Sequence, residues 1–85
     1  MHLIELKTLE QFQNLKVSER ILVKWTDYFI SHTRGADRIQ SYKIYEVNYD
    51  DTIIRCQRMN LHQFDYMLFL EGRGSVEEVY MIRSD

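Results

Sequence analysis

The 85-residue chain contains no proline and only one cysteine, and it has neither a long apolar run nor a block of like charge. A single cysteine excludes an internal disulfide framework and favours a reducing compartment. No stretch approaches the roughly 18–20 apolar residues that a membrane helix requires. Residues 1–6 are too few and too charged for a secretory signal. We therefore expect a cytoplasmic protein without a membrane association.

The charges nearly cancel, with 11 basic and 13 acidic side chains and a net charge of −2. A strongly basic nucleic-acid binder is therefore not the first expectation. One stretch does combine basic and aromatic residues that can neutralise phosphates and stack bases. These residues are Arg34, Arg38, Tyr42, Lys43 and Tyr45. Nucleic-acid binding by a small β-rich domain therefore stays an alternative.

The composition is that of a globular protein, with 45% hydrophobic and 28% charged residues. A chain of this length predicts one small domain over residues 1–85. Six Tyr, four Phe and one Trp can build a core from few residues, and aromatic side chains also suit an interface.

The first residues predict a strand followed by a short helix. Residues 2–6 favour the strand, and Thr8 with Gln11 fits a capping box at a helix N-terminus. Apolar side chains then recur at helical spacing, which predicts a helix over residues 9–16.

Three further segments follow before the middle of the chain. Residues 21–25 form an apolar, β-branched run that is typical of a strand covered on both faces. Residues 26–40 stay open between a loop with a short helix and a continued strand with a turn. Residues 42–49 predict another strand, which ends at polar residues.

Residues 51–60 bear on the topology. Ile53, Cys56 and Met59 recur at three-residue spacing, which favours a helix slightly over a strand. Such a helix would bury Cys56, and buried cysteines behave as small hydrophobes. An oxidoreductase that uses Cys56 as a single thiol stays a second alternative function.

Gly72-Arg73-Gly74 separates two apolar runs, residues 64–70 and 76–82. Glycine adopts the positive φ of tight turns, so this pattern predicts a C-terminal β-hairpin. Strands and helices alternate before it, which implies parallel strand pairing.

This order of elements resembles the thioredoxin family. The similar segments are Leu3-Ile4-Glu5-Leu6-Lys7-Thr8 with Phe12, Ile21-Leu22-Val23-Lys24-Trp25, Tyr45-Glu46-Val47-Asn48-Tyr49-Asp50, and Met67-Leu68-Phe69-Leu70-Glu71-Gly72 with Val76-Glu77-Glu78-Val79. The resemblance implies an α/β fold, a small mixed sheet with a C-terminal β-hairpin and two to three short helices.

The alternative is an α+β fold, in which an N-terminal helix packs on a five-strand antiparallel meander. Its strands would lie near residues 21–30, 38–47, 52–59, 64–71 and 76–83.

The residues that give the thioredoxin family its chemistry are missing. The family carries Cys-x-x-Cys after its central strand, and residues 29–33 here contain no cysteine. Disulfide exchange requires a thiolate, which Ser31 or Thr33 cannot replace. The family's cis-proline would fall near Phe64 and Asp65, where this chain has no proline. We therefore expect a redox-inactive version without catalytic residues, metal or cofactor.

The leading hypothesis is a non-catalytic protein-binding module. It would serve as an adaptor, an inhibitor, or an accessory protein of the kind that phages and mobile elements encode. The resemblance implies a partner surface where the family binds its substrates, with Trp25 beneath it. The partner-binding residues would then be Phe29, Ile30, Ser31, His32, Thr33, Phe64 and Asp65.

Overall fold

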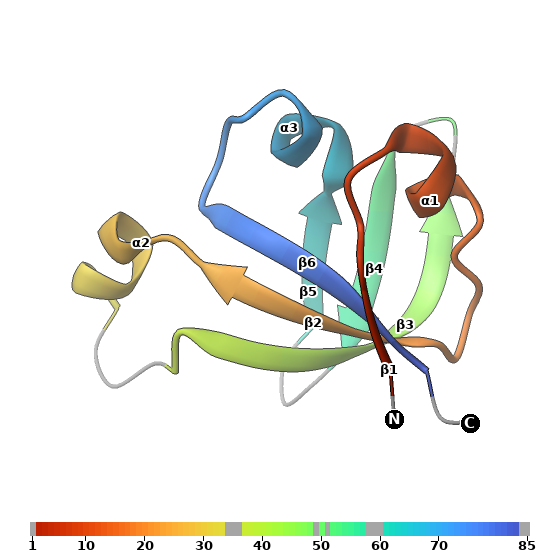
Figure 1. Cartoon of the computed structure of the whole chain (residues 1–85), viewed down its shortest axis with the longest axis horizontal. Coiled ribbons are helices and arrows are strands. Elements are labelled where there is room, and N and C mark those ends of the chain that lie inside the picture. The colour runs from red at the N-terminus through yellow and green to blue at the C-terminus, as the bar shows by residue number, and fades with distance from the viewer. Residues whose placement is uncertain (1, 34–36, 49, 51, 58–60, 84–85) are drawn as a thin grey trace.

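A computed structural model describes residues 2–33, 37–48, 50, 52–57 and 61–83 of the chain (Figure 1). These residues form one six-stranded sheet in the order β1-β6-β2-β3-β4-β5, and every neighbouring pair is antiparallel. The elements are, in chain order, β1 (His2–Glu5), α1 (Leu9–Gln13), β2 (Arg20–Trp25), α2 (Asp27–Ser31), β3 (Ile39–Asn48), β4 (Ile53–Gln57), β5 (Leu61–Asp65), α3 (Tyr66–Leu70) and β6 (Val76–Arg83).

This topology corrects the thioredoxin-like α/β prediction. A mixed sheet requires parallel pairs, and the described strands pair only in antiparallel fashion. The predicted meander is closer, because β2, β3, β4 and β5 are successive neighbours. It is also wrong, because β6 does not follow β5 in the sheet but lies between β1 and β2.

The predicted C-terminal hairpin does not form. Asp65 ends β5 and caps α3, so the apolar run after it is helical. A short apolar run suits either a buried strand or a helix, and the capping side chain decides between them here. Gly72 and Gly74 do adopt positive φ angles of 76° and 93°, but they connect α3 to β6.

The predicted helix over residues 51–60 is also wrong where the structure describes it. β4 pairs with β3 on one side and β5 on the other. Ile54 and Cys56 alternate toward the core, as side chains of a strand do. Met59, which supported the helical spacing, lies outside the described residues.

The local predictions for the first third of the chain are mostly confirmed. β1 forms, and Thr8 and Gln11 make the capping box of α1. That helix ends at Gln13, earlier than residue 16. β2 forms too, but its burial alternates: Ile21 and Val23 are buried while the residues between them are partly exposed. The prediction that both faces are covered is therefore wrong.

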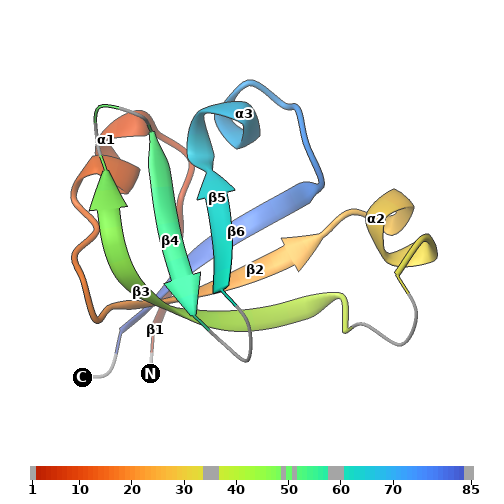
Figure 2. The same ribbon diagram turned by 180° about the vertical axis from the view of Figure 1, so that it is seen from behind.

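A bend in β3 folds the sheet over on itself. The first half of β3 pairs with β2 and its second half with β4, with an irregularity between Ile44 and Glu46. Bulges bend a strand and increase its twist. The sheet therefore makes two facing layers, one with β1, β6 and β2 and the other with β4 and β5, joined through β3 (Figures 1 and 2).

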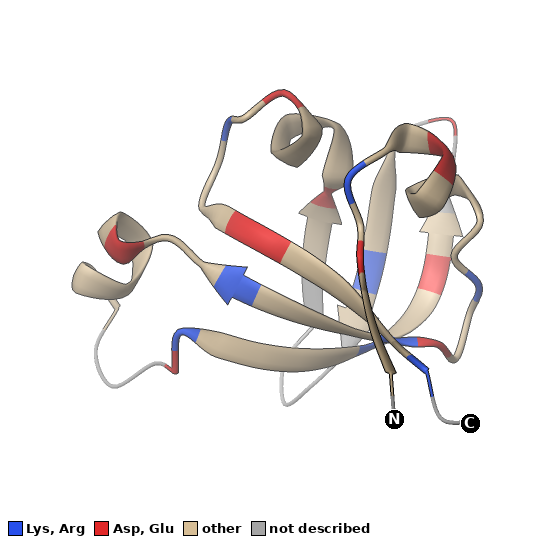
Figure 3. Ribbon diagram, viewed as in Figure 1, with Lys and Arg blue, Asp and Glu red and all other residues tan. Residues whose placement is uncertain are grey.

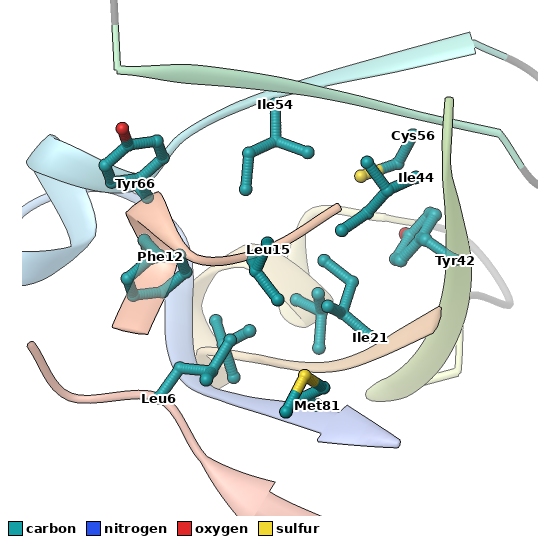
Figure 4. Packing of buried hydrophobic residues seen from close by; sticks show 12 residues of the cluster. Leu6, Phe12, Leu15, Ile21, Tyr42, Ile44, Ile54, Cys56, Tyr66 and Met81 are labelled. Atoms are coloured by element: carbon teal, nitrogen blue, oxygen red, sulfur yellow. The ribbon is translucent and has the colours of Figure 1, made fainter. Parts of the chain in front are cut away.

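The core fills the space between the layers (Figure 4). Its buried side chains come from four strands, two helices and their connections: Leu6, Phe12, Leu15, Ile21, Val23, Tyr42, Ile44, Ile54, Cys56, Tyr66, Val79 and Met81. Helices α1 and α3 lie at one end of this core (Figure 1). α2 lies to one side, beyond the end of β2 (Figure 1).

Candidate binding cleft

A cleft lies where one layer of the sheet extends past the other. β2 and the beginning of β3 project beyond β5 toward α2 (Figure 2). A cavity of about 190 Å³ lies between the inner faces of β2 and β5, and α3 and the connection to β6 complete its wall. An engineered apolar cavity of about 150 Å³ in another protein holds benzene. The cleft therefore has room for one bulky apolar group.

Most of the cleft wall is apolar. The larger apolar side chains on it are Ile21, Val23, Trp25, Phe64, Phe69 and Val76. Ile21 and Val23 also belong to the buried core, so the bottom of the cleft is anchored in the fold. Leu68 of α3 stands at the rim with 38% of its surface exposed.

Trp25 ends β2, and two hydrogen bonds join its backbone to Arg38. Its N–H donates to the Arg38 carbonyl at 2.8 Å, and its carbonyl accepts from Arg38 Nε at 3.2 Å. Its indole Nε1 is buried and finds no acceptor among the described residues. An unsatisfied buried donor costs about 1–3 kcal/mol.

Phe29 supports the cleft from outside. Thr26 caps α2 by accepting from the Phe29 N–H at 3.2 Å. The Phe29 ring then stacks on Trp25, with centroids 4.4 Å apart and planes inclined by 23°. Phe29 therefore contacts Trp25, which lines the cavity, but Phe29 does not line the cavity itself.

The other predicted residues of α2 and its end lie away from the cleft. Ile30, Ser31, His32 and Thr33 are absent from its wall. The Ser31 and Thr33 hydroxyls donate to carbonyls of the preceding turn, at 2.7 and 2.9 Å. His32 Nδ1 lies 2.8 Å from the Tyr28 carbonyl oxygen and 3.0 Å from the Ser31 hydroxyl. These polar groups therefore contact backbone carbonyls at the C-terminal end of α2.

Phe64 and Asp65, two of the residues predicted to bind a partner, lie on the cleft wall. Phe64 packs edge-on against Phe12 at 6.0 Å. The Asp65 side chain caps α3: its Oδ1 accepts from the Met67 and Leu68 N–H groups and also from the Thr52 hydroxyl. Its negative charge is therefore already solvated by three donors.

Arg73 contributes an uncompensated charge to the same wall. Its backbone N–H donates to the Leu68 carbonyl at 2.8 Å, which anchors the connection between α3 and β6. Its guanidinium is exposed and makes no hydrogen bond or ion pair with a described residue. Sequence analysis identifies Arg73 only as part of a turn. Nothing in the sequence indicates that it lies near Trp25 in the fold.

Lys24 of β2 is paired with carboxylates of β6, unlike Arg73. Lys24 lies 3.3 Å from Glu77 and 3.2 Å from Glu78, on adjacent strands (Figure 3). These neighbours raise the pKa of Lys24. The Tyr80 hydroxyl donates to the Glu78 carboxylate, which raises the pKa of Tyr80 to about 12.

Cys56 lies on the cleft wall and is buried, as predicted, although in a strand. Burial raises the pKa of its thiol to about 11. The reactive thiolate is therefore scarce at neutral pH. Among the described residues no three His, Cys, Asp or Glu side chains are grouped as a metal site would require.

The residues considered for nucleic-acid binding differ in their surroundings, and of those that the structure describes only Lys43 and Tyr45 are exposed together on β3. Tyr42 is buried in the core, where it cannot stack on a base. Arg38 lies 3.1 Å from both Asp27 and Glu77. Arg34 lies outside the described residues.

Within the described part of the chain no helix is long and apolar enough to cross a membrane. Comparison with protein-family models, with curated proteins and with solved structures found no match. The cleft is therefore interpreted from its own residues.

Proposed function

We propose that this chain is a non-catalytic, cytoplasmic protein-binding module, an adaptor or an inhibitor, whose cleft receives an apolar side chain of its partner. One observation carries the proposal: an open cavity of about 190 Å³ has Trp25, Phe64 and Phe69 on its wall. Aromatic side chains around a pocket are typical of the few residues that dominate binding energy at protein interfaces.

The chemistry of the wall supports binding over catalysis. Catalytic sites need a nucleophile or a general acid or base with a suitable pKa. The pKa of the Cys56 thiol is raised to about 11, which disfavours its thiolate. The Asp65 carboxylate is occupied by capping α3. The rest of the cleft wall is mostly apolar and suits an apolar side chain of a partner.

A random-peptide display library is the probe that tests the proposal. Peptides enriched on the protein should change the emission of Trp25, the single tryptophan of the chain. Leu68→Lys places a charge at the rim and should weaken their binding about tenfold or more, because a buried ammonium loses hydration. Leu9→Lys is the matched control, since Leu9 and Leu68 are 39% and 38% exposed.

Peptides that bind the Leu68→Lys and Leu9→Lys variants equally well would refute the cleft as the binding site. Failure to enrich any peptide that responds to Leu68→Lys would refute the proposed function. Circular dichroism of both variants establishes that each is folded.

A further inference from the structure

The edge of β5 beside the cleft carries unused backbone hydrogen-bonding groups. Among the described strands β5 pairs with β4 alone. The Tyr66 N–H donates to the Thr52 carbonyl at 3.1 Å, in register with the pairing of Asp65 and Phe64 to β4. Groups alternate along an antiparallel strand, so the Phe64 backbone faces β4 and the Gln63 N–H and carbonyl face outward.

An added strand at this edge would lie over the cleft. β2 projects beyond β5 on the same side (Figure 2), and Gln63, Phe64 and Trp25 share one cavity wall. Alternate side chains of a strand point to one face. A segment paired with β5 would therefore direct every second side chain toward Trp25, and the added strand would widen the narrower layer.

The charges on the wall indicate what such a segment carries. Arg73 has no partner among the described residues, whereas three donors already serve Asp65. A guanidinium at the rim of an apolar cavity is a good partner for a carboxylate, because charge-assisted hydrogen bonds are the stronger ones.

We propose that the occupant of the cleft is an extended segment of a partner protein that pairs with the free edge of β5. It places one bulky apolar side chain against Trp25 and presents an Asp or Glu to Arg73. This inference rests on the proposed function and adds the geometry and the chemistry of the partner. Strand addition to a sheet edge is an established mode of peptide recognition, in which main-chain bonds supply affinity and pockets supply specificity.

The test uses peptides that the display library enriches and that respond to Leu68→Lys. Gln63→Pro removes the outward N–H, and proline is tolerated where that group makes no ladder bond. Gln63→Ala keeps the N–H and removes only the side chain. We expect binding to fall about tenfold with Gln63→Pro and to change less than about twofold with Gln63→Ala. A second measurement does not depend on whether the variants fold. In the unaltered protein, adding peptide should slow hydrogen exchange at the Gln63 amide.

Arg73 is tested by charge exchange. Arg73→Glu should weaken the enriched peptides about tenfold, and replacing their acidic residue with Lys should restore binding to that variant. Arg83→Glu is the control, since Arg83 is exposed on β6 and does not line the cleft.

The outcomes separate the two proposals. Peptides that respond to Leu68→Lys but leave the Gln63 amide exchange unchanged would overturn strand addition and leave the proposed function standing. The role of Arg73 would be overturned if the enriched peptides lacked an acidic residue. It would also be overturned if Arg73→Glu and Arg83→Glu weakened peptide binding equally. A dimer whose Gln63 amide is protected without peptide would show that a second copy of the chain is the occupant.

Discussion

The rings of Phe12 and Tyr66 stack almost parallel, with centroids 4.9 Å apart and planes inclined by 1°. Phe12 lies in α1 and Tyr66 begins α3, and both side chains are fully buried (Figure 4). This contact joins the two helices beside the cleft, since Phe69 of α3 also lies on the cavity wall. Phe69 extends the cluster, because its ring packs edge-on against Phe12 at 5.8 Å.

Replacing Phe12 should therefore destabilise the whole domain. Phe12→Ala leaves a cavity beneath Tyr66, and such changes typically cost about 3–5 kcal/mol of unfolding free energy. Urea denaturation measures the change, with the milder Phe12→Leu as a companion if the alanine variant does not fold. Gln13→Ala is the control, because Gln13 is exposed on the same helix. Equal stability of the Phe12→Ala and Gln13→Ala variants would contradict the central place of this ring.

Asp65 should contribute to stability through its cap on α3. Asp65→Ala removes the acceptor for Met67, Leu68 and Thr52, and loss of such a cap costs about 1 kcal/mol. Asp65→Asn keeps an oxygen that can accept and should cost less. Thermal or urea unfolding compares the three proteins, and an alanine variant as stable as the asparagine variant would argue against the capping role.

Cys56 should react slowly with thiol reagents in the native protein. A pKa raised from 9.0 to about 11 by burial lowers the thiolate fraction at neutral pH about a hundredfold, and the surrounding side chains also restrict access. Labelling followed by mass spectrometry, with and without denaturant, gives the two rates. Equally fast labelling in both conditions would revive the single-thiol oxidoreductase alternative.

Tyr80 should ionise late in a phenolate titration. The hydroxyl donates to the negatively charged Glu78, which disfavours a second negative charge and raises the pKa of Tyr80 from 10.0 to about 12. Because the folded-state pKa is the higher one, stabilisation by this pair is complete below about pH 10 and disappears as the pH rises through about 12. Subtracting the ultraviolet titration of Tyr80→Phe from that of the unaltered protein isolates this residue. Glu78→Gln should move the pKa back toward 10.0, and an unchanged titration in that variant would rule out Glu78 as the cause.

The sequence singles out some of the residues that line the cleft, but it does not predict the cleft itself. Phe64, Asp65 and Trp25 are identified as neighbours of a binding surface, and all three lie on the cavity wall. All seven predicted residues come from a resemblance whose fold this chain does not have. Ile30, Ser31, His32 and Thr33 belong to α2 and its end and do not line the cavity. Arg73 escapes sequence analysis because only the turn after α3 brings it to the wall.

Features that depend on a few consecutive residues can be recognised in the sequence alone. The capping box of Thr8 and Gln11, the strand character of residues 21–25 and the positive φ of Gly72 and Gly74 are of this kind. Each rests on hydrogen bonds or torsion angles within a turn or a strand, so local chemistry decides it. Cys56 is buried as expected, but in β4, where it alternates toward the core with Ile54, and not in the predicted helix.

The tertiary structure alone decides the strand order and the state of ambiguous segments. β6 pairs with β2 across most of the chain, and β4 becomes a strand because β3 and β5 supply partners for its backbone. Pairing with β3 and β5 overrides the slight helical preference of residues 51–60, because a strand gains its hydrogen bonds from neighbouring strands that periodicity does not reveal. The cleft depends on the same pairing, since it exists only where the bent sheet leaves the end of β2 beyond β5.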